Sequence, residues 1–208
     1  MVKTEIILKY FPDIDKKTIH LFDKLADIYS TENEKVNLIS RKDLENLYTN
    51  HILHSLTLAK FCSFKPGQTV IDIGTGGGFP GIPLAIMFPE TSFFLCDSIG
   101  KKIRAVQSIV DALEIQNAHA INNRTELLPG PFDIAVVRAV APMATLYSWM
   151  EGKWKNNIQF YMLKGGDLSE EMNSLLEIHP GLQIKQFPIS DVYTEPFYET
   201  KKVVHILS

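Results

Sequence analysis

The stretch VIDIGTGGGFPG, residues 70–81, decides the class of fold. Its first four residues predict a short strand, and the glycines that follow predict a tight turn that opens a helix. Five of the eight residues from Gly74 to Gly81 are glycine. Glycine lets the backbone turn sharply and a ligand approach closely, because it has no Cβ atom. A strand, a glycine turn and a helix in this order favour a nucleotide site over a turn that binds nothing.

Strands and helices alternate on the C-terminal side of this stretch. Further strands are expected at 92–96, 118–122, 132–137 and 158–163, and helices at 81–88, 99–113 and 167–178. Two late strands, 182–187 and 202–207, have no helix between them and are expected to pair as a hairpin. The alternation predicts an α/β protein with a mainly parallel, doubly wound sheet.

The N-terminal side has a different character. Before Lys65-Pro66-Gly67 the apolar residues recur at helical spacing over 19–29 and 43–61, with polar connectors at 30–33 and 37–40. We therefore expect a helical N-terminal segment, residues 1–65, packed on a core formed by residues 66–208.

Composition excludes several classes of protein. Of the 208 residues 45 % are apolar and 22 % charged, the balance of a globular domain rather than a disordered or fibrous chain. The apolar run Ile82–Phe88 is far shorter than the ~20 residues that cross a bilayer, and residues 1–15 lack the layout of a signal peptide. Cys62 and Cys96 are too few for a disulfide framework or a zinc site. We expect a cytoplasmic protein with no membrane or metal partner, and its net charge of −3 argues against nonspecific coating of nucleic acid.

The glycine turn discriminates between two nucleoside cofactors. A dinucleotide fingerprint counted from Gly74 requires glycine at the sixth position, where Phe79 stands. Asp72 precedes the turn, and its carboxylate would repel a pyrophosphate. S-adenosylmethionine has no phosphate and carries a sulfonium and an ammonium. Asp72 and the glycines Gly74, Gly76 and Gly78 are therefore expected to contact S-adenosylmethionine, although Asp72 could instead cap the turn.

Polar residues also follow the next two strands. Asp97 ends the strand at 92–96, where such folds place the acid that binds the ribose hydroxyls; with Ser98 it could instead begin a helix. After the third strand, Glu126 or the backbone of Thr125 and Glu126 could hold the adenine edge, the alternative being a solvated loop.

Two cations end the fourth and fifth strands. Arg138 and Lys164 are expected over the same crevice, where they could hold a guanine edge or RNA phosphates. These strand ends lack a cysteine, which argues against a covalent cysteine mechanism. His51 and His54 are expected to pack or to face solvent rather than to bind a metal.

Taken together, these motifs resemble the small-subunit ribosomal RNA methyltransferase G family, also called glucose-inhibited division protein B. The resemblance covers nearly the whole chain and rests on Asn37–Ser40, His51–Ser55, Asp72–Gly81, Asp97–Lys102, Arg124–Glu126, Arg138–Ala139 and Leu163–Gly165. It implies a class I (Rossmann-like) methyltransferase core with a seven-stranded sheet. It also implies methyl transfer from S-adenosylmethionine to N7 of a guanine in bacterial 16S ribosomal RNA.

The resemblance also implies roles for individual residues. Gly74 and Phe79 would line the cofactor, Thr125 and Glu126 would hold its adenosine part, and Arg138 would border cofactor and substrate. One departure is His54, which stands where family members often have Asp.

The implied chemistry needs no general base, because guanine N7 has a lone pair and no proton. Arg138 and Lys164 would then orient the substrate, either 16S ribosomal RNA or the small ribosomal subunit, and we expect the enzyme to be a monomer. The alternatives are an NAD-dependent dehydrogenase, which would need a proton-relay side chain, and a noncatalytic nucleotide-binding module.

Overall fold

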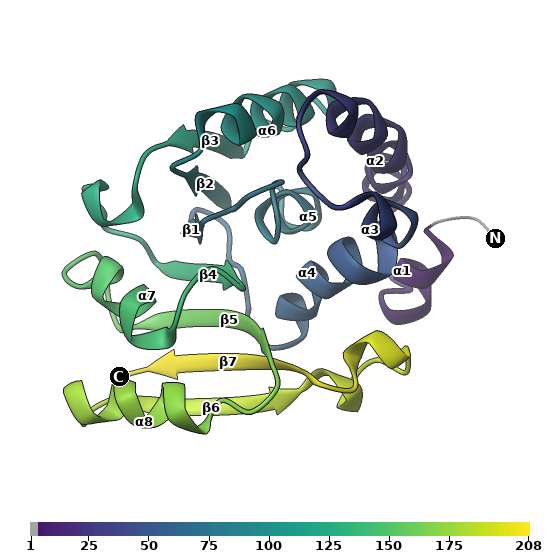
Figure 1. Ribbon diagram of the computed structural model, residues 1–208. Coiled ribbons are helices and arrows are strands. Elements are labelled where there is room, and N and C mark those ends of the chain that lie inside the picture. The colour runs from purple at the N-terminus through teal and green to yellow at the C-terminus, as the bar shows by residue number, and fades with distance from the viewer. Residues whose placement is uncertain (1–3) are drawn as a thin grey trace.

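The computed structural model describes residues 4–208, and its centre is a seven-stranded sheet in the order β3-β2-β1-β4-β5-β7-β6 (Figure 1). The strands are β1 Thr69–Ile73, β2 Ser92–Asp97, β3 Ala118–Asn122, β4 Ile134–Arg138, β5 Gln159–Gly165, β6 Gln183–Pro188 and β7 Lys201–Leu207. Strands β1 to β5 are parallel to one another, and β7 pairs antiparallel with β5 on one side and β6 on the other. The expected mainly parallel sheet is confirmed.

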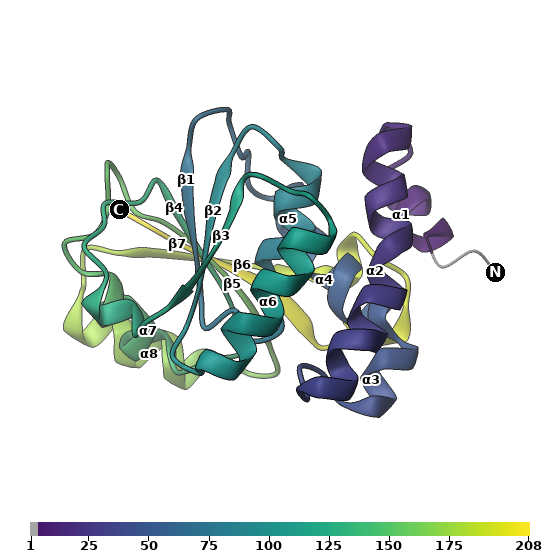
Figure 2. The same cartoon turned by 90° about the horizontal axis from the view of Figure 1, so that it is seen from above.

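Helices cover both faces of this sheet. Figure 2 shows α5 (Gly81–Met87) and α6 (Gly100–Ala112) on one face, and α7 (Met143–Met150) and α8 (Ser169–Ile178) on the other. Alternate residues of a strand point to opposite faces, so Val70 packs in the core on the α5 and α6 side while Ile71 packs in the core under α7 and α8. No helix within residues 4–208 is long and apolar enough to cross a membrane.

The N-terminal helices lie against α5 and α6. They are α1 (Glu5–Tyr10), α2 (Lys16–Lys35), α3 (Arg41–Glu45) and α4 (His54–Leu56), with a π-helical segment Leu47–Leu53 before α4 and a 3₁₀ turn Thr57–Lys60 after it. Buried residues of this segment, including those of α2, belong to the same hydrophobic core as one face of the sheet.

Two expectations for this segment were wrong. The polar stretch 30–33 lies inside α2 and is not a connector, because the buried carboxylate of Glu32 accepts hydrogen bonds from Lys35 (2.8 Å) and from Ser108 on α6 (2.9 Å). The single helix expected over 43–61 is a succession of short helical pieces.

Candidate active site

A cleft of about 410 Å³ opens where β1, β2 and β4 end. The strand order reverses direction between β1 and β4, and sheets of this kind bind their ligands at that point. The cleft is lined by residues at or just after the ends of β1 to β4, together with one residue each of α6 and α7: Gly74, Gly76, Asp97, Ser98, Ile99, Lys102, Asn123, Arg124, Thr125, Glu126, Arg138, Ala139, Val140 and Trp149. Six of the ten residues predicted for the site thus line one cleft.

Asp97 lines this cleft and is fixed by two hydrogen bonds. Its Oδ2 accepts a hydrogen bond from the backbone N–H of Gly76 (3.0 Å), and its Oδ1 accepts one from the N–H of Ile99 (2.8 Å). The carboxylate therefore joins the glycine loop to the start of α6. Each of its oxygens has a second lone pair, so it can still accept hydrogen bonds from a pair of hydroxyls.

Another wall of this cleft is a short 3₁₀ turn, Thr125–Leu127. Thr125 is buried, with its Oγ1 3.6 Å from the sulfur of Cys96, so it reaches the cleft mainly through its backbone. The backbone carbonyl of Glu126 accepts a hydrogen bond from Lys153 (3.0 Å), and its carboxylate lies 3.8 Å from Arg124 at the rim. The hydrogen bond from Lys153 therefore holds this turn against the rest of the fold.

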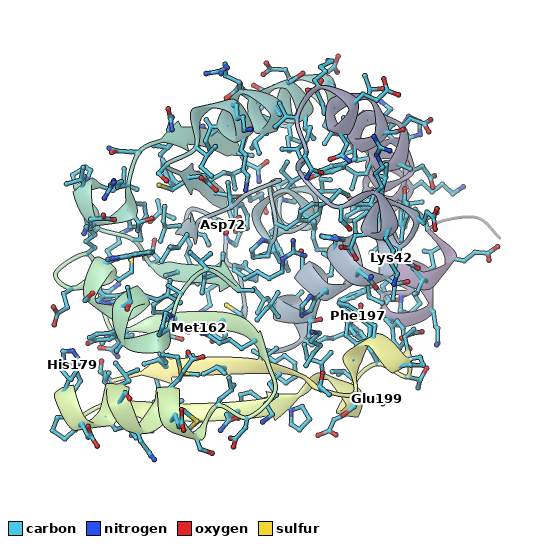
Figure 3. The ribbon with its side chains drawn as sticks, viewed as in Figure 1. Lys42, Asp72, Met162, His179, Phe197 and Glu199 are labelled. Atoms are coloured by element: carbon cyan, nitrogen blue, oxygen red, sulfur yellow. The ribbon has the colours of Figure 1, made fainter. Side chains whose placement is uncertain are left out.

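Asp72 lies beneath the glycine loop and is not among the residues that line the cleft, so its direct contact with the cofactor stays a prediction. It is fully buried near the middle of the molecule (Figure 3). Its Oδ2 accepts hydrogen bonds from Thr75 Oγ1 (2.6 Å) and from the N–H of Gly81 (2.8 Å), which fixes both ends of the loop. Burial raises the pKa of Asp72 to about 7. The structure supports the alternative role, capping of the turn.

Gly78 and Phe79 belong to the glycine loop, residues 74–81, but are not among the residues that line the cleft. A Cβ atom at Gly78 would come within 2.4 Å of Ile82, so this glycine serves close packing. The ring of Phe79 is 2 % exposed and stacks on Tyr29 with 5.0 Å between ring centroids. The ring is held between Tyr29 of the helical segment and the glycine loop. Its contact with the cofactor stays a prediction.

A second cavity, of about 250 Å³, adjoins the first. Its walls come from the helical segment, from the ends of β4 and β5 and from the chain around the start of β7: Asp43, Asn50, His51, His54, Arg138, Ala139, Leu163, Lys164, Gly165, Phe197 and Lys201. Arg138 and Ala139 line both cavities. Ala139 has a φ of +50°, a strained conformation of the kind that clusters at functional sites.

Arg138 forms the wall between the two cavities. Its guanidinium lies 5.0 Å from the centre of the Phe79 ring, and its Nη1 is 3.5 Å from the carbonyl oxygen of Asn50. Burial lowers the pKa of Arg138, while the nearby carboxylates of Asp72 and Asp43 oppose that shift. The cation is thus held in place by an aromatic face and by charges within the fold.

Lys164 lines the second cavity, but its charge is already paired. Its Nζ donates to the carbonyl oxygen of Ala141 (2.8 Å) and to Glu171 of α8 (2.5 Å). The same Glu171 carboxylate accepts the N–H of Met143 at the start of α7 (2.9 Å). Lys164 therefore fixes the loop between β4 and α7, and its expected contact with the substrate is not visible in this arrangement.

His51 and His54 are buried in the wall of the second cavity. Both ring nitrogens of His51 and the Nε2 of His54 have no hydrogen-bond partner within residues 4–208. Burial lowers the pKa of His51 to about 4 and that of His54 well below its usual value, so both are neutral at pH 7. In the described part of the chain, no group of three or more His, Cys, Asp or Glu side chains is placed to hold a metal ion.

Four further residues of the second cavity were missed from the sequence: Asp43, Asn50, Phe197 and Lys201. A signal did exist for Lys201. It begins an antiparallel strand and pairs with Gly165, so it lies at the edge where the parallel strands end. The other three lie in short helical turns whose position depends on tertiary packing.

The comparisons with known proteins agree with this geometry. The sequence model of the family described as rRNA small subunit methyltransferase G (GidB) matches residues 18–190. The chain is 51 % identical over 208 residues to the Ribosomal RNA small subunit methyltransferase G of Flavobacterium johnsoniae, with 96 % of each chain covered. It is 45 % identical to the protein of that name from Bacteroides thetaiotaomicron, with 97 % of this chain and 98 % of that one covered.

Solved structures show the same fold. A SAM-dependent methyltransferase from Aquifex aeolicus has a TM-score of 0.60 at 16 % identity, covering 85 % of this chain and 97 % of that one. The magnesium protoporphyrin IX methyltransferase of Synechocystis PCC 6803 has a TM-score of 0.60 at 16 % identity, covering 100 % and 97 %. The fold is thus that of S-adenosylmethionine-dependent methyltransferases, and the chain belongs to the rRNA small subunit methyltransferase G family.

Proposed function

We propose that this chain transfers a methyl group from S-adenosylmethionine to N7 of a guanine in the 16S ribosomal RNA of the small ribosomal subunit. We further propose that it does so in the bacterial cytoplasm and as a monomer. One observation carries the proposal: two cavities of different character meet at Arg138 and Ala139, at the end of β4. One cavity suits a nucleoside cofactor, and the other lies where a second molecule would meet it.

The residues of the first cleft fit the proposed cofactor. A Cβ atom at Gly76 would meet only the carbonyl oxygen of Gly74, at 3.9 Å, so the loop leaves that side open. Asp97 would accept hydrogen bonds from the ribose hydroxyls, and the backbone at Thr125 and Glu126 would border the adenine. When bound there, S-adenosylmethionine supplies an activated methyl group on a sulfonium.

The chain's own task is then alignment. Guanine N7 attacks with a lone pair, so no residue has to remove a proton, and a reacting pair must be held about 3 Å apart. Arg138 would orient the base from the wall between the cavities. Its planar guanidinium offers fixed donors to O6 or to a phosphate. Lys164 would help indirectly, because it fixes the loop that follows Ala139.

Family membership favours this function over the dehydrogenase alternative. The test is transfer of a labelled methyl group to small subunits that lack the modification, with naked 16S RNA as a second substrate. Modified RNA is then cleaved chemically at 7-methylguanine to map the base. We expect one guanine to be labelled at N7. A methyl group on another base, or on another atom of guanine, would overturn the proposal, and the naked RNA reports whether an assembled subunit is required.

A further inference from the structure

The second cavity contains an ordered row of polar groups. Starting from Ala139, which it shares with the cofactor cleft, the row runs through Arg138 to Asn50 and Asp43. The Nη1 of Arg138 lies 3.5 Å from the carbonyl oxygen of Asn50, and the side-chain amide of Asn50 donates to Asp43 Oδ1 (3.2 Å). An electropositive group therefore lies next to the cofactor side of the cavity, with a carboxylate beyond it.

Asp43 has free capacity to accept hydrogen bonds. Its Oδ2 accepts from Ser40 Oγ (2.8 Å), which leaves a lone pair on each carboxylate oxygen. The hydrogen bond from Ser40, with smaller effects of Asn50 and of the Arg138 charge, lowers the pKa of Asp43. Asp43 is ionised at neutral pH and is therefore an acceptor only. A ligand that meets it must present N–H or O–H donors.

An aromatic ring completes the cavity. Phe197 lies in the 3₁₀ turn Pro196–Tyr198, beside the helical segment (Figure 3), and is half-buried. The hydroxyl of Tyr198 donates to the carbonyl oxygen of Thr49, which ties this turn to the helical segment. His54 meets the Phe197 ring at 82°, with 5.5 Å between centroids. Such a ring suits stacking of an unpaired nucleobase.

We propose that this cavity receives the guanine itself, turned out of the RNA, and that Asp43 is the residue that selects guanine. This rests on the proposed function. With N7 toward the cofactor cleft, O6 comes next along the base and meets Arg138. N1–H and the 2-amino group follow and meet Asp43, while Phe197 stacks on the ring. Adenine carries an amino group in place of O6 and an unprotonated N1, so both contacts would be mismatched.

The first experiment compares two variants in methyl transfer to unmodified small subunits. Asp43→Asn keeps the shape but replaces one carboxylate oxygen by a donor, and we expect kcat/KM to fall at least about tenfold. Ser40→Ala is the matched control, because it removes the cap of α3 and leaves the carboxylate. We expect Ser40→Ala to stay within about threefold of wild type, and cofactor affinity by calorimetry to be unchanged in both variants. An equal loss in the two variants would assign Asp43 to capping and overturn the proposal.

The second experiment tests the contact directly. Subunits are reconstituted with 16S RNA that carries inosine, which lacks the 2-amino group, at the methylated position. For wild type, we expect kcat/KM to be at least about fivefold higher with guanine than with inosine at the methylated position. For Asp43→Asn, we expect this preference to be less than about twofold. A purely structural role of Asp43 would not produce this coupling between the variant and the 2-amino group. The comparison of ratios cancels any difference in N7 reactivity between the two bases. An equal preference for guanine over inosine in both enzymes would overturn the proposal. If wild type leaves guanine N7 unmodified in native subunits, the proposed function itself is overturned.

Discussion

Asp97 offers the most direct test of the cofactor cleft, because its carboxylate lines that cleft and is fixed there by two backbone N–H groups. We expect Asp97→Ala to weaken binding of S-adenosylmethionine by about 10- to 150-fold. A hydrogen bond to a charged group contributes roughly 1.5–3 kcal/mol. Isothermal calorimetry gives the dissociation constant. Asp97→Asn, which keeps one acceptor oxygen, should lose less, and unchanged affinity in a folded Asp97→Ala protein would exclude Asp97 from the cofactor site.

Arg138 allows binding of the cofactor to be separated from its use. Arg138→Lys keeps a positive charge but loses the planar fork of donors. We expect single-turnover methyl transfer to small subunits to fall at least about tenfold, near 1.4 kcal/mol, with a smaller loss of cofactor affinity. An equal loss in both measurements would place Arg138 in the cofactor site alone.

Asp72 makes stability depend on pH. Its folded-state pKa of about 7 lies above the ordinary value for an aspartate. The folded protein therefore holds a proton that the unfolded chain has already lost, and this contribution to the free energy of unfolding falls as pH rises from about 4 to about 7. We expect Asp72→Asn to have a flatter profile than wild type in that range. Urea unfolding at pH 5 and pH 7 measures the difference, and parallel profiles would mean that Asp72 is ionised in the fold.

At the scale of elements, the glycine loop contains positions of two kinds. Gly76 has a φ of +58° and faces open space, whereas a Cβ atom at Gly81 would lie 2.1 Å from Leu95. We expect Gly76→Ala to cost only about 1–2 kcal/mol of stability, the strain of a left-handed residue, but to weaken cofactor binding. Gly81→Ala should destabilise the fold more than Gly76→Ala does. Thermal unfolding with and without S-adenosylmethionine distinguishes the two effects, and normal cofactor binding by Gly76→Ala would move the cofactor away from the loop.

Elements with strong local signals were predictable from the sequence. Strands β1, β2, β4 and β5 are short, largely apolar runs. The rule that ligands bind at strand ends therefore predicted sites at Asp97 and Arg138. Helix α7 was not predicted, because it follows no glycine turn of the kind that marks the start of α5, and its first N–H is bonded to Glu171 of α8, 28 residues away. The burial of Phe79 could not be predicted, because sequence adjacency to a glycine loop does not reveal which side chains turn inward.

At the scale of the whole molecule, Glu195 connects the beginning of the described chain to its end. Its carboxylate accepts hydrogen bonds from Tyr10 Oη (2.7 and 2.9 Å) and from Lys9 on α1 (2.8 Å). We expect Glu195→Gln to lower the free energy of unfolding by about 1.5 kcal/mol through weaker bonds to Tyr10. Because Phe197 lies two residues further on, KM for the subunit should rise while cofactor affinity stays constant. Urea unfolding and methyl-transfer kinetics measure these effects, and an unchanged KM would show that α1 does not position Phe197.

The second cavity could be predicted only in part from the sequence: the strand ends placed Arg138 and Lys164 over one crevice, but the approach of the helical segment to that crevice was not predicted. Its walls come from α3, from the ends of β4 and β5 and from the turn before β7, segments that approach one another only in the folded chain. Asp43 appears in the sequence as an ordinary cap partner of Ser40, three residues earlier. Its place beside Arg138 depends on the packing of the whole helical segment against the sheet.

Strand β7 is synthesised after β5 and β6 but lies between them. During translation, a nascent chain that has emerged only as far as β6 must therefore keep the edge of β5 open, with backbone groups that could pair with other chains. The parallel strands β1 to β5 can assemble while synthesis continues, since folding proceeds from the N-terminal side. Phe197 and Lys201 come after β6 in the chain, so the wall of the second cavity that they form can be completed only once strands β1 to β6 have been synthesised.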